Sequence, residues 1–507
     1  MPSFLTFGGR TRSTIACLLT AIAVSGCGTP DDSKRIETPP DDPPDDPDPI
    51  EAELCEQGVS TPVSPTTDGT RTEASADAIF DVDASLSSAM ATVGIVEWSV
   101  DKPIRSARIE FGRDPDSPEY VAPVDLTEDG FRTLLLGMKP ATTYTLRVVA
   151  TGCEDELYVS HDVELETDFL PNGLPPVTVN DVDTTAVFPG FTIMCNGYGN
   201  ARNLVPNAET SWVLILDRDG DYVWAHNLLD SPVYGCSQAR MSADGEYVWA
   251  GNTSTVQATG ALRRVSMDGL EVEDYDLPAR HHDFTVLPNG HILYFEQQNG
   301  GGVFDDTEGP DSIMSLDPET GETTLVYDET VDFADLIESS GGAHTNSITY
   351  VSHLDAFSFS LLRSNTIALL SYPDAELLGV FNGPMDEFGV SWNTQHGHEF
   401  VEDRLLVFNN WSAEGNSALL EFTYDLETKT AGPIETYRPV PSFGTIAFGG
   451  VQRLPNGNSV VTFSSNGVIH EIDPDKVLVR EIVVSDSIGY TTKRATLYGP
   501  PPHLAAE

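Results

Sequence analysis

From about residue 175 onward the chain alternates strand, tight turn and strand, and no other feature constrains its fold as strongly. Asp-Gly and Asn-Gly pairs supply the positive φ that hairpin turns need, and aromatic and β-branched residues flank them. We find no amphipathic pattern long enough for a helix of three turns. Recurring four-stranded units of this kind predict a β-propeller. The turns lie at residues 217–220, 243–245, 267–269, 288–290, 318–321 and 455–457.

The predicted propeller spans residues 171–507. Six blades would average about 56 residues each, which is long for a blade, so we expect large loops. The Asp-rich turns resemble calcium-binding loops, but they lack the alternating ligands and the closing glutamate of such loops. We therefore predict ordinary turns there and no metal site.

A second all-β region precedes the propeller at residues 55–170. It consists of short alternating runs, such as 95–100 and 106–111, with turn residues between them. A leucine, a proline and then Tyr144 at the start of a strand have the pattern of a tyrosine corner, in which the phenol hydroxyl bonds back to the backbone. With Trp98 as a core aromatic, the region resembles an immunoglobulin-like or fibronectin type III sandwich. We expect Tyr144 and Trp98 to be structural.

The N-terminus carries an export signal. Arg10 and Arg12 precede an apolar run at 14–24 that is too short to span a membrane. The run ends in Val-Ser-Gly-Cys, which resembles the bacterial lipobox and implies cleavage after residue 26 and lipid attachment to Cys27. An ordinary signal peptide with an incidental Cys27 is the alternative. Gly28 resembles the signal for outer-membrane sorting, and the sequence leaves open whether the protein faces the periplasm or the outside.

Residues 27–54 are rich in proline and aspartate. Proline favours the extended polyproline conformation and like charges repel, so we predict a disordered tether that reaches on the order of 80 Å from the membrane. The whole chain has a net charge of −52. Such a surface suits a salty medium, and it excludes nucleic acid as a partner because binding nucleic acid needs a positive field.

The cysteines indicate two disulfides. Of six cysteines, one lies in the predicted signal peptide and Cys27 is the lipidation site, which leaves an even number in an exported chain. Three pairings are possible, and order along the chain favours Cys55 with Cys153 and Cys195 with Cys236. The absence of a Cys-x-x-Cys or Cys/His cluster in the sequence argues against a metal site.

Four polar motifs each precede a hydrophobic strand and its turn. In a propeller the innermost strand of every blade lines the central channel, so equivalent positions of successive blades meet at one end of that channel. We therefore expect histidines that are far apart in the sequence to lie within a few ångströms of one another. The motifs are RHHDF at 280–284, GAHTNSI at 342–348, TQHGHE at 394–399 and GGVQRLPNGN at 449–458.

Together, these motifs resemble the arylsulfotransferase family, the bacterial aryl-sulfate sulfotransferases. The resemblance covers the propeller and the domain order, and it implies an exported enzyme with a small immunoglobulin-like domain and a six-bladed propeller. It also implies transfer of a sulfuryl group from a phenolic sulfate ester to a phenolic acceptor. The implied mechanism is ping-pong through sulfohistidine, without a nucleotide donor such as PAPS, without a cofactor and without a metal.

The resemblance implies two catalytic histidines. His396 follows Gln395 as in the family's glutamine–histidine pair and is the nucleophile, because a neutral imidazole is nucleophilic near pH 7. His282 matches the acid/base histidine, which as an imidazolium protonates the leaving phenolate and later deprotonates the acceptor. His398 is either a second channel residue or faces the other side of its strand.

The resemblance also implies a sulfate-binding set. Sulfuryl transfer is similar to phosphoryl transfer, so charge gathers on the sulfate oxygens and needs stabilisation. His344 and Asn346 match the family's His-x-Asn motif, and Thr462 matches a late threonine. Arg363 matches an arginine on the following strand, with a spacing one residue longer. Unless a bulge restores the strand's direction, Arg363 points away from the site.

Two other functions fit parts of the sequence. A propeller on a tether also suits a non-catalytic binding or adhesion module on the cell surface. A quinoprotein dehydrogenase is a further propeller class, but we see no tryptophan-docking repeats. The sandwich domain either mediates a homodimer or spaces the propeller from the membrane.

Overall fold

The computed structural model describes residues 54–55, 69–197, 211–252, 260–298, 309–411 and 415–499. All of them belong to one compact unit, residues 50–507. The predicted signal peptide, Cys27 and nearly all of the predicted tether lie outside the described residues. No helix within the described ranges is long and apolar enough to cross a membrane.

The first part of this unit consists of two antiparallel sheets around a shared core, with one short 3-10 turn, η1 (Asp129–Phe131). The smaller sheet has the order β1-β2-β5, and the larger has the order β4-β3-β6-β7 with β8 also paired to β6. The strands are β1 (Phe80–Leu86), β2 (Gly94–Val100), β3 (Ile104–Gly112), β4 (Tyr120–Pro123), β5 (Thr133–Leu135), β6 (Thr143–Gly152), β7 (Leu157–Val159) and β8 (Val163–Glu166).

The core of these two sheets contains the predicted structural aromatics. Trp98 and Tyr144 are both buried in it. The backbone N–H of Lys139 donates to the Tyr144 hydroxyl at 2.8 Å, which confirms the bond predicted for the tyrosine corner. Cys55 and Cys153 form the predicted disulfide at the edge of this region.

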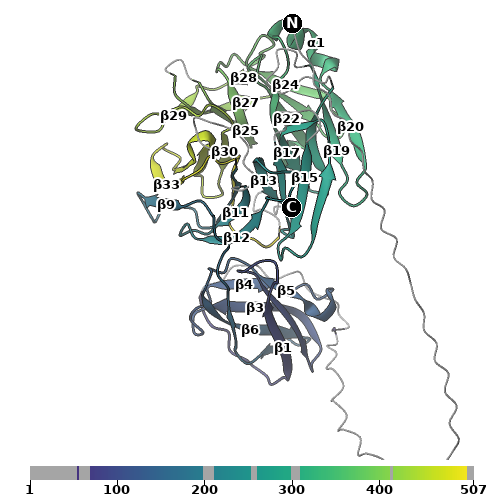
Figure 1. Ribbon diagram of the computed structural model, residues 1–507, viewed down its shortest axis with the longest axis vertical. Coiled ribbons are helices and arrows are strands. Elements are labelled where there is room, and N and C mark those ends of the chain that lie inside the picture. The colour runs from purple at the N-terminus through teal and green to yellow at the C-terminus, as the bar shows by residue number, and fades with distance from the viewer. Residues whose placement is uncertain are drawn as a thin grey trace, which may run out of the picture. The chain divides into compact units, whose positions relative to one another are not determined.

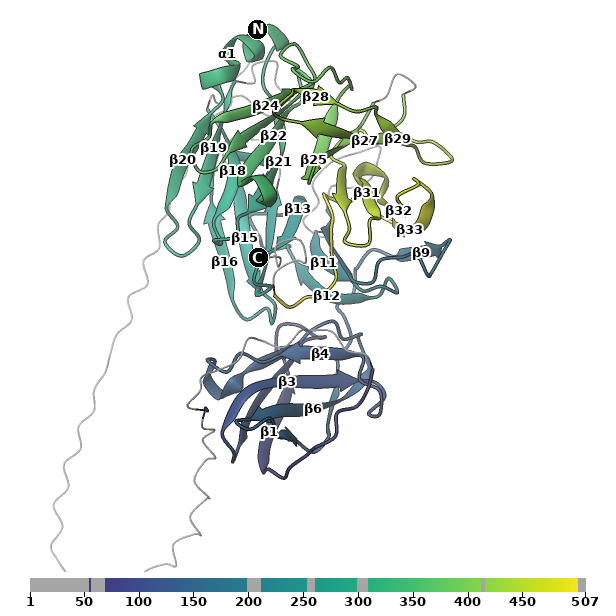
Figure 2. The ribbon, with the colours of Figure 1, turned by 180° about the vertical axis from the view of Figure 1, so that it is seen from behind.

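The remaining strands form antiparallel sheets of four or five strands around a common centre (Figures 1 and 2). The described residues contain six such sheets, with the orders β12-β11-β10-β34, β13-β14-β15-β16, β17-β18-β19-β20, β21-β22-β23-β24, β25-β26-β27-β28 and β30-β31-β32-β33-β9. β29 also pairs with β27. The structure thus confirms an all-β chain with a β-propeller.

The strands of the first three sheets are β10 (Phe191–Cys195), β11 (Trp212–Leu216), β12 (Tyr222–Asn227), β13 (Cys236–Met241), β14 (Tyr247–Asn252), β15 (Ala261–Ser266), β16 (Val272–Asp276), β17 (Arg280–Val286), β18 (Ile292–Gln297), β19 (Asp311–Leu316), β20 (Thr323–Asp328) and the closing β34 (Thr492–Arg494). Those of the other three are β21 (Thr345–Val351), β22 (Ala356–Leu361), β23 (Thr366–Ser371), β24 (Leu377–Phe381), β25 (Gln395–Val401), β26 (Arg404–Asn409), β27 (Ala418–Asp425), β28 (Thr430–Ala431), β29 (Glu435–Tyr437), β30 (Gly450–Arg453), β31 (Ser459–Phe463), β32 (Val468–Ile472), β33 (Leu478–Val484) and β9 (Val177–Asp181). Two 3-10 turns, η3 (Ser352–Leu354) and η4 (Ser464–Asn466), follow β21 and β31.

The two ends of this region close the ring. β34, near the C-terminus, pairs with β10, and β9 pairs with β33, which follows it by about 300 residues in the chain. Figure 1 shows β9 in blue beside β33 in yellow. The second predicted disulfide, between Cys195 of β10 and Cys236 of β13, joins the first sheet to the second. Closure leaves few unpaired strand edges in the ring.

One α-helix interrupts the strands, so the expectation of no three-turn helix is wrong. α1 (Thr330–Ser340) follows β20, and its Phe333, Leu336 and Ile337 are buried at helical spacing. Only this one short apolar stripe marks it in the sequence, and the surrounding strand rhythm hides it. Gly341 ends the helix at φ 78°, a conformation that favours glycine.

Candidate active site

The inner strands of successive sheets begin with β-bulges, and the predicted site residues lie in them. A bulge takes residues out of the strand ladder and changes the direction of their side chains. In β17 the bulge contains His282, in β21 it contains Asn346, and in β25 it contains His396. The structure therefore places three predicted site residues at equivalent points of neighbouring strands.

Three imidazoles from three sheets gather at this end of the inner strands. The rings of His282 and His344 lie 4.9 Å apart between centroids. Interaction with His344 lowers the pKa of both His282 and His396, after the larger effect of burial, so all three are close enough to interact. His282 and His344 have φ of 50° and 49°, a strained backbone that is often found at functional sites. The structure thus brings together the histidines of three separate motifs.

Asn410 fixes the tautomer of His396. The Nδ1 atom of His396 lies 2.7 Å from Oδ1 of Asn410. The Asn410 amide nitrogen donates to the carbonyls of Thr445 and Phe448, at 3.1 and 2.8 Å, so its oxygen must face the imidazole. An amide oxygen only accepts hydrogen bonds, and Nδ1 of His396 therefore carries the proton. The lone pair is left on Nε2, as a nucleophile requires.

His396 is also held neutral. Burial and, to a smaller extent, the nearby His344 lower its pKa to about 3, although the bond to Asn410 acts in the opposite direction. The ring is therefore uncharged at neutral pH, and its Nε2 lone pair is available.

His282 is neutral for the same reasons. Burial lowers its pKa well below the ordinary value, and the nearby His344, His281 and His396 lower it further. This differs from the expectation that His282 itself stores an imidazolium. Its Nδ1 lies 2.8 Å from Nδ1 of His281, so only its Nε2 remains for a substrate.

Asn346 and Gln395 position the strand that carries the nucleophile. Nδ2 of Asn346 donates to the Gln395 carbonyl at 2.8 Å, which leaves one amide hydrogen for a sulfate oxygen. The Gln395 amide nitrogen contacts Ser360 Oγ and two carbonyls of the neighbouring sheet, and its oxygen accepts from Trp392. Gln395 thus holds β25 in place, and Asn346 is engaged mainly with backbone.

Arg363 is not on a strand, contrary to the expectation. The ladder of β22 ends at Leu361, and Arg363 lies exposed in the turn that leads to β23. The turn is bound to the site, because the N–H of Leu362 donates to the His344 carbonyl at 3.2 Å. Arg363 is therefore at the same end as the imidazoles but on the surface.

Two further predicted residues have local partners. Thr462 is buried on β31, the second strand of its sheet, and its hydroxyl bonds to that of Thr491. His398 lies between Ser347 Oγ and Ser358 Oγ, at 3.0 and 2.8 Å, and burial lowers its pKa to about 3. His398 is thus a structural residue rather than a second channel histidine.

Comparison with known families settles the relationship. The profile of the family described as Arylsulfotransferase (ASST) matches residues 147–484, about two thirds of the chain. The chain belongs to the arylsulfotransferase family. Membership supports aryl sulfotransferase activity in general. No curated protein matches this chain.

Three solved structures that resemble this chain have low sequence identity to it. A Bacteroides caccae protein of unknown function is 13% identical with a TM-score of 0.39, over 60% of this chain and 98% of its own. Virginiamycin B lyase from Staphylococcus aureus is 14% identical with a TM-score of 0.37, over 62% and 99%. The periplasmic gluconolactonase of Pseudomonas aeruginosa is 13% identical with a TM-score of 0.36, over 69% and 94%.

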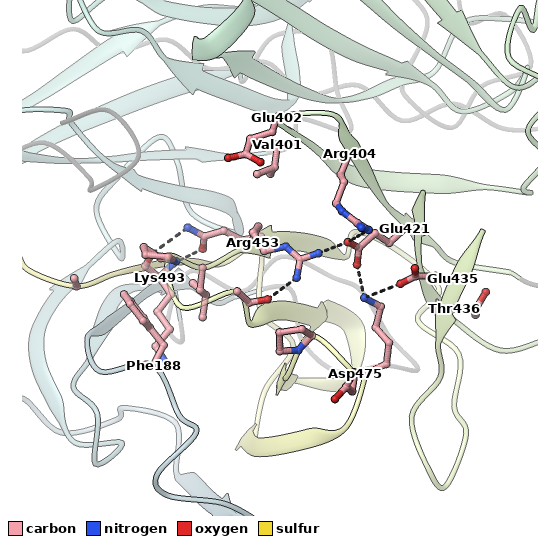
Figure 3. Close-up of a pocket in the computed structure, with 17 residues that line it drawn as sticks. Phe188, Val401, Glu402, Arg404, Glu421, Glu435, Thr436, Arg453, Asp475 and Lys493 are labelled. Carbon is pink, nitrogen blue, oxygen red and sulfur yellow. Dashed lines mark hydrogen bonds and ion pairs between the residues drawn. The ribbon is translucent and has the colours of Figure 1, made fainter. Parts of the chain in front are cut away.

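A large cavity lies away from the imidazoles. It has a volume of about 1080 Å³ and is lined by Val401 and Arg404, at the opposite end of β25 from His396. Five strand residues separate the two ends, or about 16 Å. Figure 3 shows Arg404 and Arg453 directed at the Glu421 carboxylate, and Lys476 also binds it. Three cations therefore surround the Glu421 carboxylate, and we assign the cavity no ligand.

One carboxylate group has the arrangement of a metal site within the described ranges. Ligand oxygens of Asp217, Asp219 and Asp221 lie within 4.8 Å of one another. The Lys139 ammonium lies 2.6 Å from oxygens of Asp219 and Asp221 and 3.2 Å from Asp217. Because this ammonium already supplies a positive charge, we interpret the three aspartates and Lys139 as an ion-pair cluster.

The sequence did not reveal three residues of the candidate site. Asn410 ends the apolar run of β26 at the edge where His396 begins β25, and such a polar residue after a strand was the available signal. His281 is the first histidine of the HHD motif. Asp311 lies at the start of β19, beside a segment outside the described residues, and no pattern marks it.

Proposed function

We propose that this protein is an aryl-sulfate sulfotransferase that works by a ping-pong mechanism through sulfohistidine at His396. The observation that carries the proposal is the fixed tautomer of His396, whose Nδ1 proton is bound to Asn410 so that Nε2 keeps its lone pair. Nucleophilic catalysis needs such an activated, oriented group. Membership of the arylsulfotransferase family supports the same reaction class.

In the first half-reaction, Nε2 of His396 attacks the sulfur of a phenolic sulfate ester. The S–N bond forms, the bond from sulfur to the aryl oxygen breaks, and the departing phenolate takes the Nε2 proton of His282, whose Nδ1 gains a proton in the same step. In the second half-reaction a phenolic acceptor returns a proton to His282 and its oxygen takes the sulfuryl group from His396. The sulfuryl group never requires a nucleotide carrier, a cofactor or a metal in this scheme.

Neighbouring groups stabilise the sulfate oxygens. His344 adjoins both catalytic imidazoles and is half-buried, so it can donate to an oxygen of the bound sulfate. The remaining amide hydrogen of Asn346 and, at the surface, the Arg363 guanidinium complete the set, with Thr462 as a further member. A cation at this end favours the approach of an anionic donor to a chain whose net charge is −52.

Localisation is part of the proposal. The sequence up to Cys27 supports export and lipid attachment, and the two disulfides are typical of exported proteins. We place the enzyme on a membrane through this anchor, in the outer membrane by the Gly28 signal. A homodimer through the N-terminal β region is compatible with this arrangement.

The test is transfer from 4-nitrophenyl sulfate to phenol by the purified protein. We expect nitrophenol release by wild type, loss of release in His396→Ala, and a sulfuryl adduct on His396 by mass spectrometry after incubation with the donor alone. His353→Asn, an exposed histidine on the turn after β21, is the matched control and should keep wild-type activity. If folded wild type releases no nitrophenol with any of several donors and acceptors, the chain is a binding or adhesion module instead.

A further inference from the structure

The proposed reaction needs a proton that His282 cannot store. His282 is fully buried and lies beside His281, His344, His396 and Arg280, all of which disfavour a charged imidazole at this position. A neutral imidazole that gives its Nε2 proton to a phenolate must receive another proton at Nδ1, because an imidazolate would be far too basic. The inference that follows rests on the proposed function and concerns the source of that second proton.

His281 is the group in contact with the other nitrogen of His282. The two Nδ1 atoms lie 2.8 Å apart, and a contact this short between ring nitrogens needs one proton between them. The ring of His281 stacks on Phe295, with centroids 5.8 Å apart, so its plane is fixed. Its Nε2 lies 3.1 Å from Oδ1 of Asp311, as an ion pair rather than an aligned hydrogen bond.

Glu329 is a second buried acid beside Asp311. Oε2 of Glu329 accepts from the Asp311 backbone N–H at 2.9 Å, and Oε1 accepts from the Thr345 hydroxyl at 2.6 Å. Burial and the nearby Asp311 carboxylate raise the pKa of Glu329 well above its ordinary value, so Glu329 is held as the neutral acid. Of the two carboxyl groups, Asp311 is the one that faces His281.

We propose that His281, as an imidazolium paired with the Asp311 carboxylate, stores the proton that His282 delivers to the leaving phenolate. In the first half-reaction the phenolate takes the Nε2 proton of His282 while Nδ1 of His282 takes the Nδ1 proton of His281. His281 is left neutral and keeps its Nε2 proton beside Asp311. In the second half-reaction the acceptor phenol gives its proton to Nε2 of His282, and the Nδ1 proton returns to His281.

This relay of protons between His281, His282 and the phenols returns to its starting protonation state after one reaction cycle. Each proton that leaves with the first phenol is replaced by the proton of the second, so no exchange with solvent is needed. His281 and Asp311 act only through His282, and both are therefore positioning residues rather than catalytic ones. Their contribution to the rate is largest when the leaving phenolate is strongly basic, because only such a group needs the proton in the transition state.

The dependence on the leaving group is the test. Release of phenol in the first half-reaction is measured for wild type, Asp311→Asn and His281→Asn with two donors, 4-nitrophenyl sulfate and phenyl sulfate. With phenyl sulfate, whose phenol has a pKa of about 10 like tyrosine, we expect both variants to lose about 100-fold or more. With 4-nitrophenyl sulfate, whose phenolate leaves readily, the loss should stay below about 10-fold. Asp335→Asn, an exposed carboxylate of α1, is the matched control for the lost charge.

Thermal unfolding of each variant shows whether it is folded. If Asp311→Asn does not fold, His281→Asn still tests the relay. Equal losses with both donors, or no loss with phenyl sulfate, would overturn the relay while leaving the proposed function intact. Inactive wild type with both donors would overturn the proposed function and the relay with it. A loss confined to the basic leaving group supports the relay, because a merely structural defect would affect both donors alike.

Discussion

Single hydrogen bonds decide what each histidine of this protein can do. His396 and His398 are two residues apart and both neutral, yet His396 is bound on one nitrogen by Asn410 and His398 on both by serine hydroxyls. Only His396 therefore has a lone pair left for attack. His282 differs again, because its partner is another imidazole.

At the residue scale we predict that Asn410→Ala lowers kcat with 4-nitrophenyl sulfate about 100-fold, or about 2.7 kcal/mol of barrier, because the proton of His396 is no longer fixed at Nδ1. Asn410→Asp should also fail to restore activity, since a carboxylate cannot donate to the Thr445 and Phe448 carbonyls that orient the side chain. Steady-state kinetics and the yield of the His396 adduct measure both effects. Asn289→Ala, an exposed turn residue, is the control, and unchanged kcat in Asn410→Ala would contradict the prediction.

At the scale of elements, the bulge at the start of β25 depends on a close contact with the next inner strand. The Gly397 N–H donates to the Gly449 carbonyl at 2.8 Å. A Cβ atom on Gly397 would lie 2.7 Å from Cα of Gly450 and 2.8 Å from the Gly449 oxygen, and both are backbone atoms that cannot swing away. Glycine beside the nucleophile is thus required by packing.

We predict that Gly397→Ala displaces the bulge that carries His396. The expected result is a loss of kcat of about 100-fold together with a lower Tm, because the added methyl overpacks a buried contact at a cost of about 1–3 kcal/mol. Kinetics and thermal unfolding measure the two effects. Gly444→Ala is the matched control, since its Cβ would meet nothing closer than 3.4 Å. Wild-type kcat in Gly397→Ala would show that the bulge tolerates the shift.

The helix α1 connects the acid pair to the imidazoles. Glu329 directly precedes the helix, and the chain passes from its last turn through Gly341 to His344. Phe333, Leu336 and Ile337 pack one face of the helix into the core. The helix therefore holds both Glu329, before its first residue, and His344, after its last turn, in position. A short insertion between β20 and β21 thus serves two parts of the site.

At the scale of the whole molecule, the strand pairs of β9 and β34 that close the ring must hold together against electrostatic repulsion between the many acidic side chains. The whole chain has a net charge of −52, and folding brings like charges closer together than they are in the unfolded chain. We predict that Tm rises by roughly 5 °C between about 0.02 M and about 0.5 M NaCl, as the Debye length falls from roughly 20 Å to roughly 4 Å. Calorimetry in NaCl and in KCl measures the shift, and a Tm that is flat or falls with salt would contradict it.

The sequence by itself determined the classes of structure and the chemistry available. The Asp-Gly and Asn-Gly turns fixed short antiparallel strands because their backbone conformation is local, and the even number of cysteines in an exported chain indicated the two disulfides. The histidine motifs predicted that His282, His344 and His396 would lie close together, because equivalent positions of successive inner strands meet at one end of a propeller.

Only the tertiary structure decided which atoms meet. The Asn410 partner of His396, the His281–Asp311 contact behind His282 and the exposed turn position of Arg363 depend on the register of strands in different sheets. A one-residue bulge reverses the direction of a side chain, and no local pattern specifies where a bulge falls. Burial among neighbouring charges then set the protonation of each histidine, which is a property of the assembled ring and not of the motif.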